Sequence, residues 1–434
     1  MAKRLWPGLW VAVVIVLVTV GFSGWGECGS QVAVQKVLLD GGGGGGWERV
    51  EDGEGGAREI FAGGSGREGD GEREVEFAIG VEITASYGTA AIRWRNGTFT
   101  DVVKIEGNGK FKEAMRWYGD DANMHLHPPY KWFDEPPSDY LRVLLRRIRK
   151  KLGLPATPQI GPLSSLIASL HDHATIFLRS HSLPLTPHLV LARPLLNALY
   201  AEDIRDALEY VSLPSEPSTS LCKKHEECTI PLAPWGAYVG HGYGLCTHFS
   251  NTELCDQEMS VLPPRTPSGR SGRNKTLVVT WTEDMLQITH RDMAAYYHET
   301  RRPSTYPRND TVRWDLSTAE IPERDSREWI GRFWDYLFDR VGIAMEMQSR
   351  VEPVVLDKVL LVGDGMGREW EWEEWRREGV TTGAGLVIKA LKQMFWELGM
   401  EDEWKGVDVR SDEAVFVGAR GAAEYAYRWE SGYE

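Results

Sequence analysis

Several features that mark common classes of protein are absent from this sequence. Basic residues are in the minority: 49 Lys and Arg stand against 63 Asp and Glu, and the net charge of −14 argues against nucleic acid as the main partner. No two cysteines are spaced as C-x-x-C, so a zinc finger is disfavoured and no metal site is predicted. Repeats of solenoid length are also absent. What remains is a chain of 434 residues, long enough for two or three lobes with sizeable cores.

Cysteine is scarce, with 5 residues in the whole chain, and four of them lie in one region while Cys28 stands alone. Four clustered cysteines in an oxidising compartment are typical of two disulfides, for which three pairings are possible. The alternative is a zinc site, which spacings of 6, 18 and 9 residues fit poorly. The clustered cysteines are Cys222, Cys228, Cys246 and Cys255.

Residues 1–26 have the pattern of a signal anchor or a signal peptide. Lys3 and Arg4 precede residues 5–25, a run of 21 without a charged side chain, which suffices to cross a bilayer. The positive flank predicts a cytoplasmic N-terminus and a lumenal body, in the membrane or lumen of the endoplasmic reticulum. Small residues between 21 and 26 offer cleavage sites, so a cleaved signal and a secreted body remain the alternative. Three glycosylation sequons are compatible with either location, at Asn96, Asn274 and Asn309.

Residues 27–74 are predicted to be a disordered tether. The stretch is dominated by Gly, Glu, Asp and Arg and includes six consecutive glycines at 41–46. Such a composition buries too little apolar surface to offset the entropy of ordering the chain. We therefore expect the ordered body to begin near Val75.

The body, residues 75–430, is predicted to have an α/β fold, because runs with strand character alternate with runs of helical period. Asn96-Gly97 between two strand runs is typical of a β-hairpin turn. Strands are expected at 77–83, 90–95, 102–105, 188–192, 277–281, 285–289 and 359–362, and helices at 138–152, 162–180, 195–208, 326–341 and 382–398.

The helix expected at 138–152 is amphipathic. One face carries apolar residues and the rest of the surface is basic. The basic part is expected to be a solvated helix face, and the alternative is a surface for anionic lipid or a partner. The apolar residues are Tyr140, Leu141, Leu144, Leu145, Ile148 and Leu152, and the basic ones are Arg142, Arg146, Arg147, Arg149, Lys150 and Lys151.

The first candidate for chemistry is the segment Ile79 to Tyr87. A buried strand ends at Glu82 and is followed by the small residues Thr84, Ala85 and Ser86. The amides of such a turn can bind phosphate, and the acid can hold a metal-bound water. The structural alternative is an ordinary β-hairpin.

The second candidate is a glycine-rich turn after the strand at 359–362, formed by Gly363, Asp364, Gly365 and Gly367. A dinucleotide-binding fingerprint does not fit, because the spacing is G-x-G-x-G and no βαβ partner is evident. A third segment, residues 280–289, pairs a strand with a turn containing Thr282 and Glu283.

Two further segments are rich in small residues. Residues 411–423 predict a helix that Ser411 caps, with so many Ala and Gly that another backbone is expected to pack tightly against it. Residues 234–244, which begin Pro-Trp-Gly-Ala-Tyr, predict a second short helix.

Taken in order, these segments resemble the ATPase domain of 70-kilodalton heat-shock chaperones, in the actin-like superfamily. The first is similar to the phosphate loop I-G-I-D-L-G-T-T-Y-S, the glycine turn to the adenosine loop V-x-L-V-G-G-S-x-R, and residues 411–423 to the helix D-E-A-V-A-x-G-A-A. Residues 234–244 look like the helix that links the two lobes, E-P-T-A-A-A-I-A-Y-G. The resemblance implies a bilobal fold of two mixed sheets flanked by helices, with lobes at about 75–230 and 231–430. It also implies a cleft that binds ATP or ADP with magnesium.

The sequence departs from the family at the phosphate loops. Glu82 replaces an aspartate and Thr84 a glycine, while residues 280–289 lack every glycine of the second loop, D-L-G-G-G-T-F-D-V-S. Trp281 is expected to crowd a phosphate there, and the catalytic lysine has no clear counterpart, Lys131 being only a guess. The family's substrate-binding domain has no counterpart in this sequence.

The resemblance therefore favours a degenerate protein that binds nucleotide weakly or not at all and serves as an interaction module for an unidentified protein partner. One alternative is an active lumenal ATPase, with Glu82 at the metal or water, Thr84 to Ser86 and Thr282 to Glu283 at the phosphates, and Gly363 to Gly367 at the adenosine. A second alternative is a secreted, disulfide-stabilised glycoprotein of unrelated fold.

Overall fold

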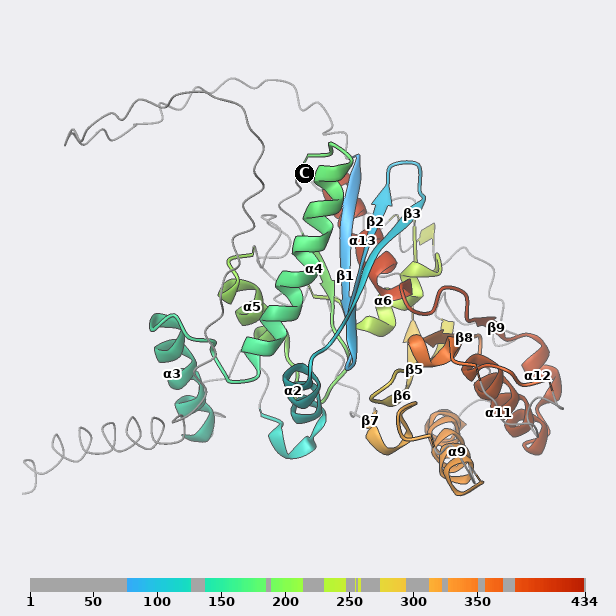
Figure 1. The fold of residues 1–434 in the computed structure, drawn as a ribbon. Helices are drawn as coiled ribbons and strands as arrows, with labels where there is room; N and C mark the ends of the chain where they lie inside the picture. Colours follow the sequence, from blue (N-terminus) through green and yellow to red (C-terminus); the bar gives the residue numbers. More distant parts are fainter. Residues whose placement is uncertain are drawn as a thin grey trace, which may run out of the picture. The chain divides into compact units, whose positions relative to one another are not determined.

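The structure, a computed structural model, describes most of the body (Figure 1). Residues 70–434 form one compact unit, and residues 1–69 lie outside the described residues. The expected segments 1–26 and 27–74 are therefore not described. The described residues are 76–125, 137–184, 189–213, 230–246, 254, 257–258, 274–293, 312–321, 327–349, 356–369 and 379–432.

The first sheet combines a three-stranded antiparallel meander with one parallel strand. Its order is β3-β2-β1-β4, with β2 antiparallel to β1 and β3, and β4 parallel to β1. The expected Asn96-Gly97 hairpin is confirmed: Gly97 adopts φ +85°, and the amide of Trp94 donates to the carbonyl of Thr98. The strands are β1 (Phe77–Ile83), β2 (Tyr87–Trp94), β3 (Phe99–Glu106) and β4 (Leu189–Ala192).

The second sheet repeats the same arrangement. Its order is β7-β6-β5-β8-β9, with β6 antiparallel to β5 and β7, and β8 parallel to β5. Both sheets thus begin with a meander whose first strand also pairs in parallel with the fourth. The expected mixed α/β architecture with two mixed sheets is confirmed. The strands are β5 (Asn274–Trp281), β6 (Leu286–Met293), β7 (Val312–Arg313), β8 (Lys358–Val362) and β9 (Asp408–Arg410).

Helices flank both sheets (Figure 1). The helices expected at 138–152, 162–180, 326–341 and 382–398 are present, and the third of these is longer than expected. The described helices are α2 (Gly109–Gly119), α3 (Pro137–Lys151), α4 (Ile160–Ser180), α5 (Ala201–Tyr210), α6 (Ala233–Gly240), α9 (Arg327–Ser349), α11 (Gly383–Glu397), α12 (Glu401–Lys405) and α13 (Val417–Gly432), with short 3-10 turns η1 (Asp121–Asn123), η3 (Trp314–Leu316) and η4 (Asp364–Gly367).

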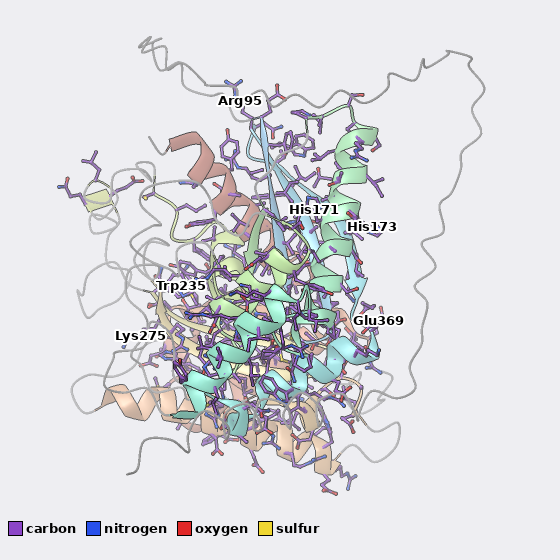
Figure 2. All side chains as sticks on the ribbon, turned by 90° about the vertical axis from the view of Figure 1, so that its left-hand side faces the viewer. Arg95, His171, His173, Trp235, Lys275 and Glu369 are labelled. Carbon is purple, nitrogen blue, oxygen red and sulfur yellow. The ribbon has the colours of Figure 1, made fainter. Side chains whose placement is uncertain are left out.

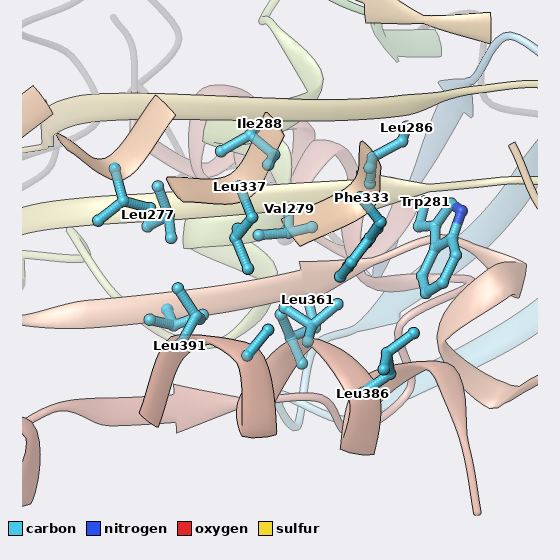
Figure 3. Close-up of a cluster of buried hydrophobic side chains, with 14 of the residues drawn as sticks. Leu277, Val279, Trp281, Leu286, Ile288, Phe333, Leu337, Leu361, Leu386 and Leu391 are labelled. Atoms are coloured by element: carbon cyan, nitrogen blue, oxygen red, sulfur yellow. The ribbon is translucent and has the colours of Figure 1, made fainter. Parts of the chain in front are cut away.

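The strand β1 separates two helices on opposite faces of the first sheet. Ile79 packs in a cluster with Leu178 of α4, whereas the next residue, Gly80, meets the backbone of Ala423 in α13. Successive residues of a strand point to opposite faces, so α4 and α13 cover the two sides. The second sheet has its own apolar core, shown in Figure 3, in which Val279 and Trp281 of β5 pack with Phe333 of α9 and Leu391 of α11.

The small residues of α13 are packed as the sequence predicts. A Cβ atom on Gly421 would overlap the backbone of Gly236 in α6, and one on Gly240 would overlap Val417. A Cβ atom on Gly80 would overlap backbone atoms of both Ala419 and Ala423. The interface formed by α6, α13 and β1, called here the glycine interface, therefore tolerates no larger side chain at these positions.

The expected start of α13 is wrong. The sequence predicts a helix from Ser411, but residues 412–416 form turns and the helix begins at Val417. Glu413 adopts a left-handed conformation with φ +57°, and the carbonyl of Ala414 accepts from the amide of Gly363 rather than from a helical amide. Tertiary contact thus overrides the favourable capping sequence.

The helix expected at 195–208 also starts late, at Ala201. The carbonyl of Leu195 accepts from the Gln287 side chain, and the amide of Ala198 donates to the carbonyl of Tyr118. These backbone groups are therefore already bonded outside a helix. The carboxylate of Asp203 accepts from the amide of Tyr200 at 2.9 Å and fixes the true start.

The helix α3 is oriented with its apolar side outward. Arg146 is only 4% exposed and lies against Asp203 and Asp206 of α5, so the expectation of a solvated basic face is wrong for this residue. The apolar residues predicted on one face are instead exposed, from 40% for Leu144 to 69% for Leu152.

None of the described helices is long and apolar enough to cross a membrane. The run at 5–25 lies outside the described residues, so its prediction stays untested. Cys246 is buried and disulfide-bonded, while Cys222, Cys228 and Cys255 lie outside the described residues and the pairing stays open. Asn96 is exposed in its hairpin turn, Asn274 donates its side-chain amide to the Tyr238 hydroxyl, and Asn309 is not described.

Candidate functional site

The two segments expected to form phosphate loops are both tight turns built around a threonine. In the first, the Thr84 amide donates to the Tyr87 carbonyl, and Thr84 Oγ1 accepts from the amides of Ser86 and Tyr87 at 3.2 and 3.0 Å. In the second, the Thr282 amide donates to the Met285 carbonyl, and Thr282 Oγ1 accepts from the Met285 amide at 3.2 Å. In each turn the threonine hydroxyl accepts hydrogen bonds from backbone amides of the same turn, as in other threonine turns.

The two turns contact each other directly. Ser86 Oγ donates to Thr282 Oγ1 at 2.8 Å and accepts from the amide of Asp284 at 3.1 Å. All three side chains are buried. We call this contact, between residues 84–86 and 282–284, the turn junction. The structure thus brings together Thr84, Ser86 and Thr282 of the two expected phosphate loops, with Ala85 completely buried beside them.

Two carbonyls of the second turn also accept hydrogen bonds. The amide of Thr318 donates to the Thr282 carbonyl at 3.1 Å, and the amide of Ala319 to the Glu283 carbonyl at 3.0 Å. In the first turn, the Ser86 carbonyl accepts from Gly107 at 2.7 Å. The hydrogen-bonding groups of the turn junction are thus used mainly within the protein.

Glu82 is buried against the first turn of α13. A Cβ atom on Gly418 would overlap its carboxyl group, and neither carboxyl oxygen makes a hydrogen bond of standard geometry. Burial raises the pKa of Glu82 to about 8, although the nearby amides of Ala419 and Gly418 partly oppose the shift. At neutral pH the group is mostly protonated. With no cation beside it, the carboxyl group therefore carries little negative charge at neutral pH.

Two lysines, one in strand β3 and one in helix α2, pair with acids of the second turn and the glycine turn. Lys112 of α2 pairs with Glu283 at 2.5 Å and with Asp284 at 2.8 Å, and Lys104 of β3 pairs with Asp364 at 2.8 Å. Partial burial alone would lower the pKa of Lys112, but its hydrogen bonds to Asp284 and Glu283 outweigh that effect and raise the pKa. The bond to Lys112 in turn lowers the pKa of Glu283.

These lysines were not identified from the sequence. Lys104 lies in a strand and Lys112 in the first turn of a helix, and neither belongs to a motif. The sequence does place three acids, Glu283, Asp284 and Asp364, in the two turns. Because like charges repel, acids brought together in this way predict that cations lie nearby. Lys131 lies outside the described residues.

The glycine turn after β8 packs against the end of β5. Gly363 adopts φ +104°, which favours glycine, and a Cβ atom there would overlap the Trp281 carbonyl. Gly365 meets Thr318 and Trp281 in the same way, whereas Gly367 has open space around it. The predicted adenosine loop therefore lies next to the second turn.

The expected crowding by Trp281 is wrong. Its side chain is fully buried in the core of the second sheet, where it stacks with Phe333 at a centroid distance of 5.3 Å and donates to the Leu316 carbonyl at 3.0 Å. Only its backbone reaches the glycine turn. Trp281 lies on the same face of β5 as Leu277 and Val279, so its large side chain packs in the core.

The arrangement offers a site of paired charges and paired hydroxyls. Among the described residues no group of three or more His, Cys, Asp or Glu side chains is placed to hold a metal ion. The acids that could hold magnesium, Glu283 and Asp284, are bound to Lys112. The negative charges of Glu283 and Asp284 would oppose a phosphate here, and Lys112 could pair with the phosphate only if both of its ion pairs opened.

Comparisons with known proteins give only distant structural matches. No family model and no curated protein matches the sequence. Glucokinase from Balamuthia mandrillaris, solved with glucose, is 12% identical, with a TM-score of 0.34 over 81% of this chain and 93% of that one. The ethanolamine utilization protein EutJ from Carboxydothermus hydrogenoformans is 11% identical (TM-score 0.31; 82% and 92%), and a ROK hexokinase from Thermus thermophilus is 11% identical (TM-score 0.33; 81% and 98%). Similarity this low supports no transfer of activity.

Proposed function

We propose that this chain is a degenerate member of the actin-like superfamily that does not hydrolyse ATP and serves as an interaction module. The duplicated strand order supports the fold, because both sheets start with the same meander and the same parallel fourth strand. A duplicated α/β arrangement is what the resemblance to chaperone ATPase domains implies.

The observation that carries this proposal is the turn junction. In a working phosphate site, backbone amides stay free until phosphate arrives. Here the amides of Thr84, Ser86 and Tyr87 in one turn, and of Thr282, Asp284 and Met285 in the other, all donate to protein oxygens. Phosphate would have to break these bonds before it could make its own.

The protonation of Glu82 supports the same conclusion. Phosphoryl transfer depends on positioned charge, above all on metal ions and their carboxylate ligands. A carboxyl group with a pKa of about 8, buried against Gly418, supplies little such charge at neutral pH when no cation lies beside it. Mg-ATP is therefore expected to bind weakly, if it binds at all.

An active ATPase is the second candidate, and one observation favours it. Lys104 and Lys112 pair with acids of the glycine turn and the second turn, and both would be available to pair with phosphate if those pairs opened. In that reading the two lysines would leave their acids and pair with phosphate, while Glu283 and Asp284 would take magnesium. Under both candidates we propose a protein partner and no binding of nucleic acid.

The location we propose is the secretory pathway. The charge-free run at 5–25 and the positive residues before it support entry into that pathway, as anchor or as cleaved signal. The disulfide at Cys246 supports an oxidising compartment.

The proposal is tested by thermal unfolding of the full chain with ATP, ADP or no nucleotide, each with magnesium, alongside a phosphate-release assay. We expect unchanged unfolding temperatures and no phosphate release above that of a Glu82→Ala/Lys112→Ala variant. Turnover in the wild type that this double variant loses would establish the active ATPase instead. Glu113→Gln, an exposed change on α2, serves as the matched control.

A further inference from the structure

The outward face of α3 is the largest concentration of exposed apolar side chains in the described residues. Seven of the fifteen large exposed apolar side chains lie between residues 140 and 154. Single exposed apolar residues are ordinary on protein surfaces, but a contiguous group marks a binding surface. The seven are Tyr140, Leu141, Leu144, Leu145, Ile148, Leu152 and Leu154, called here the α3 stripe.

This orientation is fixed by charge. Arg146 Nη1 pairs with Asp203 at 2.9 Å and Nη2 with Asp206 at 2.5 Å, while Lys150 pairs with Asp206 at 3.0 Å. Arg142 adds a pair with Glu202 at 3.5 Å. An amphipathic helix usually turns its apolar side to the core, so the buried ion pairs of α3 hold it the other way round.

Two cations border the α3 stripe. Arg147 and Lys151 are exposed, and no described residue forms an ion pair with either of them. At 100° per residue they lie on the edge of the stripe that also carries Tyr140. The acids nearest to α3, on α5, point to its opposite side and are already paired. The outward face therefore combines an apolar strip with unpaired positive charge.

We infer that the α3 stripe is a docking surface for a membrane carrying anionic lipid headgroups. A helix lying in the interface plane needs apolar residues on one side, cations at the edge and an aromatic residue near headgroup level. The stripe has leucine and isoleucine, the edge has Arg147 and Lys151, and Tyr140 supplies the aromatic ring. The helix spans 15 residues, about 22 Å, which is long enough to lie along a bilayer surface.

Charge favours a lipid surface over a second copy of this chain. Two α3 stripes packed together would bring both sets of Arg147 and Lys151 into one interface, and the acids of α5 are occupied by Arg146 and Lys150. Anionic headgroups supply the missing negative charge. The helix α3 lies on the left in Figure 1, the side of the molecule that faces the viewer in Figure 2.

Hydroxyl-radical footprinting of the full chain tests this inference, because it reads the exposure of individual side chains even if residues 5–25 also bind lipid. The chain is measured alone, with phosphatidylcholine vesicles, and with vesicles that also contain phosphatidylserine. We expect oxidation of Tyr140, Leu144 and Leu152 to fall severalfold with the anionic vesicles and less with the neutral ones. Ile176 and Trp396, which are 61% and 65% exposed on other helices, should stay oxidisable.

Two variants sharpen the test. Leu144→Gln/Ile148→Gln should abolish the protection of Tyr140 and Leu152, and because both residues are exposed the fold should be unaffected. Arg147→Gln/Lys151→Gln should remove the preference for anionic vesicles. Ile176→Gln is the matched control and should behave as the wild type.

Three outcomes would overturn the inference. No protection of the α3 stripe by either vesicle would exclude a lipid surface and leave a protein partner. Protection that appears without vesicles as the protein concentration rises would identify a second copy as the occupant. Equal protection of Ile176 and Trp396 would show unspecific adsorption.

Discussion

The glycine interface and the turn junction differ in what fixes their residues. At the glycine interface, α6, α13 and β1 approach so closely that Gly80, Gly240 and Gly421 have no room for a Cβ atom. At the turn junction Thr84 and Thr282 stand where the chaperone pattern has glycine, and the hydroxyl groups of Thr84, Ser86 and Thr282 form hydrogen bonds there. Contacts that hold the backbone together thus keep the expected pattern, whereas loops that would hold phosphate do not.

The difference has a physical basis. A backbone collision cannot be relieved without moving a helix, so a close-packed interface restricts its residues to glycine and alanine. The residues of a phosphate loop are restricted only while phosphate must bind. If the two turns do not bind phosphate, as we propose, hydrogen bonds within the protein stabilise them better than free amides do.

The largest effect is expected from Gly80→Ala. The new Cβ atom would overlap the backbone of Ala419 and Ala423, so we expect destabilisation by more than about 4 kcal/mol, or failure to fold. Gly331→Ala, on an exposed part of α9 with nothing near, should stabilise by about 0.5–1 kcal/mol. Urea unfolding measures both. Equal, small effects would mean that the glycine interface is looser than described.

Glu82 should make the folded state less stable as pH rises. Its pKa is about 8 in the folded protein against an ordinary value of 4.5 for a glutamate side chain, so the folded state holds a proton that the unfolded state has lost between these values. Stability should fall across this window by on the order of 5 kcal/mol, and Glu82→Gln should abolish that fall. Unfolding from pH 4 to pH 9 measures it. A wild-type profile in the Gln variant would contradict the burial of this carboxyl group, and Glu113→Gln is the matched control.

Arg146→Ala tests the charge-fixed orientation of α3. Removing the guanidinium leaves Asp203 and Asp206 buried without their main partner, and we expect a loss of about 3–5 kcal/mol. Arg147→Ala, one residue away and exposed, should change stability by less than about 0.5 kcal/mol. Chemical unfolding separates the two. Similar values for both would show that the ion pairs do not hold the helix.

Ser86→Ala should have the smallest effect of the four. The change removes the donor to Thr282 and leaves the buried amide of Asp284 without its acceptor, which costs about 1–3 kcal/mol. Ser165→Ala, an exposed hydroxyl on α4, is the control and should be neutral. Thermal unfolding under identical buffers gives the comparison. No loss at Ser86 would argue that the turns of the two sheets are not joined.

Much of the fold could be predicted from the sequence, because local signals and tertiary contacts agree there. Asn96-Gly97 favours a tight hairpin turn, and the apolar run expected as a strand at 277–281 lies in the buried part of β5. The predicted start of α13 was wrong because the amide of Gly363 donates to the carbonyl of Ala414, a contact between residues about fifty positions apart. No local pattern carries such information.

The site was predictable only in part, for a similar reason. The sequence indicated that the turns around Thr84 and Thr282 belong together, but the lysines that pair with their acids come from β3 and α2 and follow no motif. The orientation of α3, with its apolar side outward, could not be predicted either. It depends on ion pairs between Arg146 and acids of α5 sixty residues away.

The most direct test of the central claim is calorimetric titration of the full chain with Mg-ATP and Mg-ADP. We expect no detectable heat up to millimolar nucleotide, because the amides of Thr84, Ser86, Tyr87, Thr282, Asp284 and Met285 already donate to protein oxygens and Glu82 is mostly protonated. Micromolar binding of ATP that Lys112→Ala weakens and Glu113→Gln leaves unchanged would contradict it, and would show that the junction opens to admit nucleotide.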